Sequence, residues 1–381
     1  MSFTMLAVVV AVGLLGPLLA VRRNWHVPVV LGELLAGVLL GRTGIGYLDA
    51  ADERFTFLAE IGFGLVMFVA GTHVPVRDAG LRRAIRPGVL RAVITGVVAT
   101  GLAFGLNALF DTGHVALYAV LMASSSAALI LPIVDSLGLG GTAVVELLPQ
   151  VALADAACIV ALPLAIDPRH AGRAALGALA VIAAGVIAYV LLSRVERSGV
   201  RRRVHDVSED QHLTIELRVS LLVLFALAGL ATATHVSIML AGFVLGLAVA
   251  AVGEPRRLAR QLFALTEGFL GPVFFVWLGA SLDLRELGAH PALLGLGLAL
   301  GAGALISHLS GVLTRQPLSI AALSAAQLGV PVAAATVGTT LHVLKSGEPA
   351  ALIVGALVTI AVSTIAGGLA VRRGLVAQGK V

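Results

Sequence analysis

Apolar residues run in long segments along this chain, with short polar connections between them. A helix of about 20 apolar residues is long enough to cross roughly 30 Å of hydrocarbon. Hydropathy and helix-breaking residues together predict thirteen such spans, with ends defined to about 2–4 residues. The predicted spans are 4–21, 27–44, 56–75, 88–110, 113–135, 142–166, 172–193, 212–233, 236–252, 262–281, 291–313, 317–342 and 349–371. The pattern predicts an all-helical, polytopic membrane protein.

The composition agrees with this class. Of 381 residues, 59% are hydrophobic and only 12% are charged, and the mean hydropathy is +1.02. A soluble domain of this length needs more charge to cover its surface. Segment 4–21 resembles a signal peptide in length, but no Lys or Arg precedes Arg22, so we interpret it as a retained span. The single cysteine, Cys158, excludes an intramolecular disulfide.

Basic residues are distributed unevenly between alternate loops. If the N-terminus lies outside, the cytoplasmic loops hold 19 of the 26 Lys and Arg residues and the outer loops hold six. The long connection from Arg194 to Gln211 contains Arg201–Arg203, which we interpret as a topology determinant at lipid headgroups and not as a nucleic-acid site. We therefore expect a bacterial inner (cell) membrane protein with its N-terminus outside and its C-terminus in the cytoplasm.

Asp155 is the most deeply placed charge in any predicted span. It lies near the middle of the sixth span, with no cation within one helical turn. A charge at that depth costs about 2.5–3.5 kcal/mol on insertion scales, so it needs a function or a partner. Burial favours a protonated carboxyl, whereas a bound cation favours the carboxylate, so one group can exchange a proton for a cation. The alternative is a carboxyl that stays neutral or caps a broken helix.

Two other spans carry signs of an interrupted helix. The fifth contains Ser124, Ser125 and Ser126 followed by Pro132, and the twelfth contains Gln327 followed by Pro331. Broken helices in the two halves of a transporter point to an inverted-repeat binding site. We expect the three hydroxyls and nearby carbonyls to complete the cation site of Asp155. Taken singly, each interruption is also consistent with an ordinary packing kink.

Other polar residues inside spans have weaker claims. His308, in the eleventh span, is a possible titrating partner of Asp155 or a hydrogen-bonded structural histidine. Snorkelling or pairing between helices explains the charges nearer span ends more simply. These are Glu33, Glu60, Glu216, Arg218 and Glu267. We expect no enzyme chemistry and no cofactor, and we assign the 44 glycines to helix packing.

Three segments carry a recognisable pattern. They are Val27-Pro28-Val-Val-Leu-Gly32-Glu33-Leu-Leu-Ala-Gly37-Val-Leu-Leu-Gly41, Leu58-Ala-Glu60-Ile-Gly62 continuing to Met67-Phe68-Val-Ala-Gly71, and Val273-Phe274-Phe275-Val-Trp-Leu-Gly279. In these segments, and in their order, nearly the whole chain resembles the monovalent cation:proton antiporter-2 family. That family includes Kef-type potassium efflux proteins and bacterial sodium/proton antiporters.

The resemblance implies a homodimer whose protomers each have a dimerisation domain and a mobile core, interleaved in sequence. The fifth and twelfth spans would cross as partly unwound helices, and Asp155 would be the transport carboxylate. Residues 1–381 would form a single transmembrane domain, and we expect no soluble regulatory domain. Three departures from the family pattern leave the site poorer in charge than in typical relatives. Ala154 stands before the transport aspartate, where relatives have a second aspartate, an asparagine or a glutamine. His308 stands where many relatives have a lysine, and Gln327-Leu-Gly329 stands where they often have Arg-Gly-Glu.

These observations predict a secondary transporter that exchanges protons for Na⁺ or K⁺ by alternating access, with Asp155 as the shared site. Two alternatives stay open. One is a proton-coupled exporter of an organic cation or metabolite, for which Ala154 leaves extra space beside the carboxylate. The other is a gated cation channel or sensor that keeps the fold without obligatory exchange.

Overall fold

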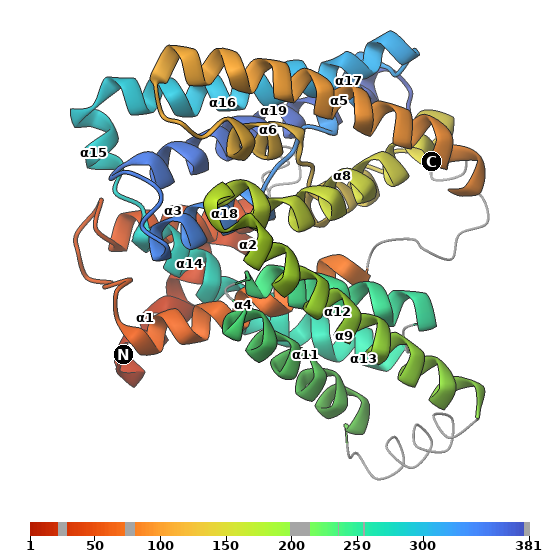
Figure 1. Ribbon diagram of the computed structural model, residues 1–381. Helices are drawn as coiled ribbons and strands as arrows, with labels where there is room; N and C mark the ends of the chain where they lie inside the picture. Colours follow the sequence, from red (N-terminus) through yellow and green to blue (C-terminus); the bar gives the residue numbers. More distant parts are fainter. Residues whose placement is uncertain (22–28, 73–80, 199–213, 235, 254–255, 377–381) are drawn as a thin grey trace.

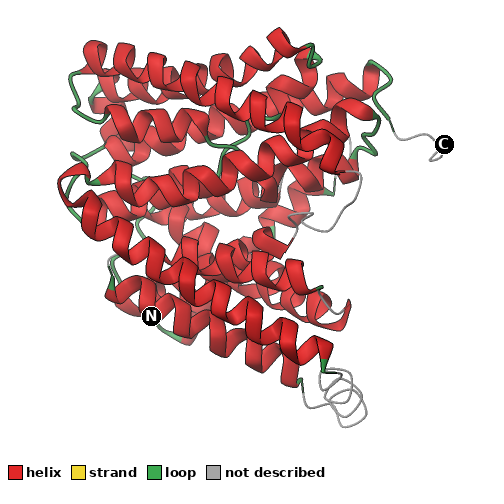
Figure 2. Cartoon of the chain, turned by 45° about the vertical axis from the view of Figure 1, so that its right-hand side comes forward, coloured by secondary structure: helices red, strands yellow, loops and turns green. Residues whose placement is uncertain are grey.

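The computed structural model describes residues 1–21, 29–72, 81–198, 214–234, 236–253 and 256–376 (Figure 1). Within these ranges the protein is helical throughout, as Figure 2 shows, apart from short connections and one isolated antiparallel bridge between Leu139 and Val376. The all-helical fold predicted from the sequence is confirmed. The connection with Arg201–Arg203 and the segment Val27–Pro28 lie outside the described residues.

Each predicted span coincides with one helix or with a pair of consecutive helices. The helices are α1 (Phe3–Gly13), α2 (Leu15–Ala20), α3 (Val29–Leu40), α4 (Glu53–Thr72), α5 (Leu81–Phe110), α6 (Val115–Ala123), α7 (Ala127–Ser136), α8 (Thr142–Ile166), α9 (Ala171–Arg197), α11 (Ile215–Ala233), α12 (Ile238–Val252), α13 (Arg256–Leu265), α14 (Gly271–Ser281), α15 (Leu284–Ala289), α16 (Pro291–Leu309), α17 (Leu318–Leu323), α18 (Gly329–Thr340) and α19 (Glu348–Arg372). Short 3₁₀ turns occur at Pro168–His170 (η2) and Ser310–Thr314 (η4), and a π-helical turn at Thr266–Leu270 (η3) joins α13 to α14. Among the described residues, nine helical stretches are long and apolar enough to cross a membrane.

The helices pack into two groups. The core group contains α5–α8 and α16–α19, and the second group contains α1–α4, α9 and α11–α14. In Figure 1 the core group occupies the upper part of the molecule and the second group the lower part. Most packing takes place inside each group, and the contacts between the groups are sparser. Each group is therefore a coherent body of helices.

Glycine brings the helices of the second group into backbone contact. A Cβ atom on Gly279 of α14 would lie 2.1 Å from the Leu34 carbonyl oxygen and 2.9 Å from Gly37 Cα of α3. The pair α4 and α12 repeats the arrangement, because a Cβ on Gly246 would lie 2.3 Å from the Phe68 oxygen. Small residues allow such close approach between helices in a membrane. The glycines that carry the family resemblance are therefore packing residues here.

The charged residues nearer span ends differ in burial. Glu216 and Arg218 lie at the start of α11, consistent with a position near the membrane surface, and Glu267 is exposed in the π-helical turn. Glu33 is only 3% exposed, enclosed within the second group. Snorkelling, the simpler interpretation from the sequence, is therefore wrong for Glu33, because α3 is covered on the face that carries this residue.

A partly buried ion pair and a hydrogen bond join three elements at one end of the core group. Arg91, one of the 19 basic residues counted on the cytoplasmic side although it falls within the predicted span 88–110, lies inside α5 and is buried. Its Nη2 lies 2.7 Å from Glu146 Oε2 of α8, and its Nε donates to Thr314 Oγ1 of η4 at 2.8 Å. Because a buried charge is tolerated only when it is paired, this contact fixes how the ends of α5 and α8 and η4 pack together.

Candidate functional site

The fifth span is interrupted at the three serines. Residues Ser124–Ser126 separate α6 from α7, and the backbone at Ser124 is extended, with φ −70° and ψ 152°. The Ser124 hydroxyl donates to the Leu121 carbonyl at 2.8 Å. Serine side chains offer the backbone such local alternatives to helical hydrogen bonds, which is why a run of them weakens a helix. Pro132 lies further on, within α7, so the break precedes the proline.

The twelfth span is interrupted in the same way. Helix α17 ends at Leu323 and α18 begins at Gly329, so Gln327 lies in the unwound segment. Pro331 lies in the first turn of α18. A proline is tolerated there because the N–H groups of the first turn have no partner within the helix. Both expected interruptions are present, and each proline follows the break.

The two unwound segments bind to each other. The Ser125 hydroxyl donates to the Ser324 carbonyl at 2.6 Å, and the Ser126 amide donates to the Ala326 carbonyl at 2.8 Å. Non-helical backbone at membrane depth needs partners of this kind, because hydrocarbon offers none. We call this contact the crossing and define it by Ser124–Ser126 and Ser324–Leu328.

Gln327 closes the end of α6. Its side-chain amide donates to the carbonyl oxygens of Leu121 at 2.7 Å and Ser124 at 3.2 Å. The last carbonyls of a helix have no partner within it and carry a partial negative charge. The neutral side-chain amide of Gln327, in the unwound segment before α18, satisfies these carbonyls. The family resemblance leads us to expect charged residues in this part of the twelfth span.

Asp155 is a residue of α8, and its side chain lies at the beginning of α7. It is 5% exposed, and its Oδ2 accepts a hydrogen bond from the Ala127 amide at 3.0 Å. Ala127 is the first residue of α7, where the helix dipole places a partial positive charge. The carboxyl therefore caps a broken helix, as one sequence-based alternative anticipated. Among the described residues this is the one hydrogen bond of the carboxyl group, so its other oxygen can take a proton or a cation.

His308 bridges the two breaks. Its Nε2 lies 3.0 Å from the Ser124 carbonyl oxygen and its Nδ1 lies 3.0 Å from Ser324 Oγ. A carbonyl oxygen only accepts, so Nε2 carries a hydrogen. Within the described part of the chain, the hydrogen bonds of His308 go to the crossing and none joins it to Asp155. Any coupling between the two residues therefore passes through the crossing.

Two buried amides extend the polar network, and the sequence reasoning missed them. Gln316 Nε2 donates to Gln150 Oε1 at 2.9 Å, and Gln150 Nε2 donates to Ser324 Oγ at 3.3 Å. Both glutamines are buried. The available signal was an uncharged polar residue inside a predicted span, because Gln150 precedes Asp155 in the sixth span. Buried polar groups of this type are normally hydrogen-bonded, so each needed a partner.

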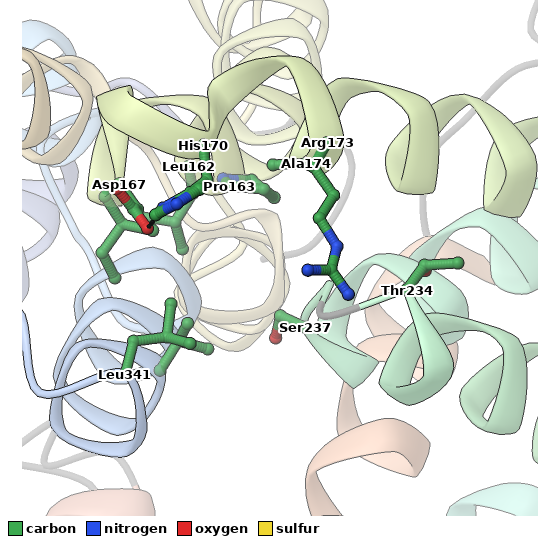
Figure 3. Close-up of a pocket in the computed structure, with 11 residues that line it drawn as sticks. Leu162, Pro163, Asp167, His170, Arg173, Ala174, Thr234, Ser237 and Leu341 are labelled. Carbon is green, nitrogen blue, oxygen red and sulfur yellow. Dashed lines mark hydrogen bonds and ion pairs between the residues drawn. The ribbon is translucent and has the colours of Figure 1, made fainter.

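A cavity of about 320 Å³ lies at the far end of α8 (Figure 3). Leu162 and Ile166 line it, and they follow Asp155 by seven and eleven residues. Residues at that spacing share one face of a helix. The cavity therefore lies on the same face of α8 as Asp155, nearer the end of the helix.

Polar residues line one edge of this cavity. His170 Nδ1 lies 2.7 Å from Asp167 Oδ2, and this hydrogen bond lowers the pKa of the Asp167 carboxyl below its ordinary value. In Figure 3 the guanidinium of Arg173 reaches from α9 toward Thr234 and Ser237. The cavity thus has an apolar wall along α8 and a charged edge.

The oxygen atoms at the crossing suit a small cation better than a transition metal. Within the described residues, no three His, Cys, Asp or Glu side chains gather as a metal site. Asp155 is accompanied by serine hydroxyls and backbone carbonyls, and oxygen ligands of this type bind hard cations. Two of the three serine hydroxyls donate their hydrogen to carbonyl groups, so they face any ligand as acceptors.

Comparison with known proteins gives one family over almost the whole chain. Residues 7–376 match the family described as "Sodium/hydrogen exchanger, transmembrane". A candidate Na⁺/H⁺ antiporter of Bacillus subtilis (strain 168), YjbQ, is 25% identical over 380 residues, covering 94% of this chain and 61% of that protein. The Na⁺/H⁺ antiporter NhaS5 of Synechocystis sp. is 29% identical over 260 residues, covering 68% of this chain and 36% of that protein. The chain thus spans less than two thirds of the length of these two relatives.

Two further comparisons bear on length and fold. The Na⁺/H⁺-K⁺ antiporter GerN of Bacillus cereus is 22% identical over 265 residues, which cover 68% of this chain and 67% of GerN. The solved structure of the sodium proton antiporter MjNhaP1 from Methanocaldococcus jannaschii superimposes with a TM-score of 0.68. The superposition covers 98% of this chain and 97% of that one at 18% sequence identity. At that identity the likeness establishes the fold.

Proposed function

Because this chain belongs to the transmembrane sodium/hydrogen exchanger family, we propose that it exchanges protons for Na⁺ or K⁺ by alternating access, with Asp155 as the shared site. The observation that carries the proposal is the position of Asp155, buried at the first amide of α7 beside the crossing. The protein is a transporter in this proposal, and its cargo is the cation and the proton.

In this proposal Asp155 has two neutral states. With a proton bound, the carboxyl is uncharged, and with a cation bound, the ion pair is uncharged as a whole. An empty carboxylate at this depth is costly, because burial penalises an unpaired charge. The Ala127 amide offsets only part of that cost. Binding of either a proton or a cation is therefore favoured over an empty site, and this competition is what exchange requires.

The finer assignments extend the same proposal. We assign the chain to the cation:proton antiporter-2 branch on the three sequence segments, and we take the core group as the mobile body and the second group as the dimerisation body of a homodimer. The uneven distribution of Lys and Arg supports an N-terminus outside and a C-terminus in the cytoplasm of a bacterial cell membrane. Residues 1–381 act as one transmembrane domain in this scheme.

A counter-ion screen on purified protein in proteoliposomes tests the function. We expect an imposed pH gradient to be dissipated by Na⁺ or K⁺ and not by choline. A pH response to an organic cation alone would instead favour the exporter, for which Ala154 beside the carboxyl gives room. Cation current without proton flux would favour a channel. Either result contradicts the proposed exchange.

The hydroxyls at the crossing should tune cation affinity. Replacing Ser125 or Ser126 by alanine removes one oxygen ligand but leaves Asp155, so we expect the apparent KM for the cation to rise severalfold while transport persists. The measurement is initial exchange rate against cation concentration, with Ser198→Ala at the exposed end of α9 as the control. An unchanged KM in both single variants and in the double variant would count against coordination by this segment.

His308 should shape the pH profile if it titrates during exchange. Free histidine has a pKa of about 6.5 and free lysine about 10.4. We therefore expect His308→Lys to move the working range upward in pH. His308→Gln should flatten the profile but leave some exchange, because Asp155 still carries the proton. The measurement is the exchange rate from about pH 5.5 to 9, spanning the histidine value. Superimposable profiles for the wild type and both variants would show that His308 only holds the crossing together.

A further inference from the structure

A second cavity, of about 460 Å³, lies between the two groups of helices. The second group contributes α4 and α14 to its walls, through Thr56, Glu60 and Trp277. The core group contributes the last turns of α18, through Thr336 and Thr339. Ionisable residues from the connecting loops also line it: Arg42, Asp283, His342 and Lys345. The cavity is therefore bounded by both bodies that must move relative to each other during alternating access.

Glu60 is an unusual residue to find in that wall. It lies within the membrane-spanning helix α4 and is half-buried. In the part of the chain that the structure describes, no hydrogen bond or ion pair engages its carboxyl group. Pairing between helices, one sequence-based explanation for this residue, is therefore not what the structure shows. Ionisable groups inside spans usually face a cavity and have a function there, because their insertion is costly.

The threonine hydroxyls that line the same cavity as Glu60 act as acceptors toward it. Thr336 Oγ1 donates to the Val332 carbonyl at 2.9 Å, and Thr339 Oγ1 donates to the Ala335 carbonyl at 2.7 Å. Thr56, one turn before Glu60, donates to the Ala50 carbonyl at 3.0 Å. Each hydroxyl donates its hydrogen to a backbone carbonyl, and Thr56 Oγ1 also accepts from Trp277 Nε1 at 3.3 Å, so these oxygens can offer a ligand only lone pairs. A carboxylate with several acceptor oxygens matches a hard monovalent cation.

We propose that Glu60 is a second cation-binding carboxylate, which receives the transported ion in this cavity before it reaches Asp155. The inference rests on the proposed function for the identity of the ion. The loop residues place basic and acidic groups together at the cavity edge, whereas Glu60 is the carboxylate carried by a membrane-spanning helix. An ion that has passed the edge meets Glu60 and the threonine oxygens together.

The position of Glu60 along α4 connects this cavity to the crossing. Met67 follows Glu60 by seven residues and lies on the same face of the helix. A Cβ on Gly329, the first residue of α18, would lie 3.3 Å from Met67 Cε and Sδ. Methionine is flexible enough to yield to a passing ion or a moving helix. Glu60 and the crossing therefore lie on the same side of α4, with Met67 between them, and the proposed path of the ion passes both.

Transport kinetics give the first test. In proteoliposomes, Glu60→Gln should raise the apparent KM for the cation about fivefold with little change in kcat, the size expected for a partly exposed ion pair. Glu60→Asp should recover most of the affinity. Glu53→Gln makes the same chemical change at an exposed position in the first turn of α4 and should leave KM unchanged. Equal KM values for Glu60→Gln and Glu53→Gln would overturn the proposal.

Thiol labelling gives a second test that does not depend on transport. Thr340→Cys, in a Cys158→Ala and Asp155→Asn background, places a thiol in the cavity wall. Na⁺ or K⁺, but not choline, should slow its reaction with a membrane-impermeant reagent when Glu60 is present, and should not do so in the Glu60→Gln variant. Equal protection with and without the carboxylate would also overturn the proposal. Because Asp155 is already replaced, this result stands apart from the outcome of the exchange assays.

Discussion

We expect replacement of Asp155 by asparagine to abolish proton-coupled exchange, with a loss of at least about 100-fold, in a protein that still inserts and folds. Asparagine has the same shape, and its side-chain oxygen can still accept the Ala127 amide, so the cap on α7 is kept. What is lost is the ability to carry a proton or a cation charge. We measure exchange in proteoliposomes and thermal unfolding in detergent for the same preparation.

The asparagine variant separates the two interpretations of Asp155. If the residue only capped a broken helix, Asp155→Asn would retain exchange, and the proposed mechanism would be wrong. Asp167→Asn is a matched control, because it makes the same chemical change in the connection after α8, at the edge of the first cavity. We expect that control to keep most of the activity. Equal loss of activity in both variants would mean that the effect is not specific to the position of Asp155.

We expect replacement of Gly279 by alanine to destabilise the folded protein by about 1–3 kcal/mol or more, the range seen when a packed core is overfilled. The added Cβ would lie 2.1 Å from the Leu34 carbonyl oxygen, and a backbone atom cannot turn aside as a flexible side chain can. Helices α3 and α14 must then separate. The measurement is thermal unfolding of the purified protein, together with the yield of folded protein from the membrane.

Gly101→Ala is the matched control for this prediction. Gly101 lies on α5, and a Cβ there meets no atom within 4 Å. Alanine is also the better helix former, so this variant should be as stable as the wild type or slightly more stable. Equal unfolding temperatures for Gly279→Ala and Gly101→Ala would show that the α3–α14 contact can relax, and would remove the packing role of the glycine.

Much of the fold could be predicted because hydropathy reports the length and place of a helix directly. All thirteen predicted spans fall on helices. The two spans predicted to be interrupted are broken at or near the residues from which the interruption was predicted. The positions of the two breaks agree with the three serines and with Gln327, whereas both prolines lie after the break. Pro331 lies in the first turn of α18, where a proline costs little, whereas Pro132 lies further inside α7. Each proline therefore marks the neighbourhood of an interruption and not its position.

The partners of the site residues could not be predicted in the same way. Ser124 and His308 are 184 positions apart in the chain, yet their bond holds the crossing together. Hydropathy gives the depth of a residue along its own helix, but not which neighbour covers that face. For the same reason the sequence left snorkelling and pairing between helices both open for Glu33, which is enclosed, and it gave no partner for Arg91, which is buried.

The bond from the Ala127 amide to Asp155 has a spectroscopic consequence. This amide proton shares its acceptor with whatever occupies the carboxyl group, so its chemical shift follows the occupant. A proton on Asp155 weakens the acceptor, a metal ion polarises it, and an empty carboxylate holds the amide most tightly. The backbone at the first residue of α7 therefore contains its own label for the loaded and unloaded states, without any probe attached to the protein.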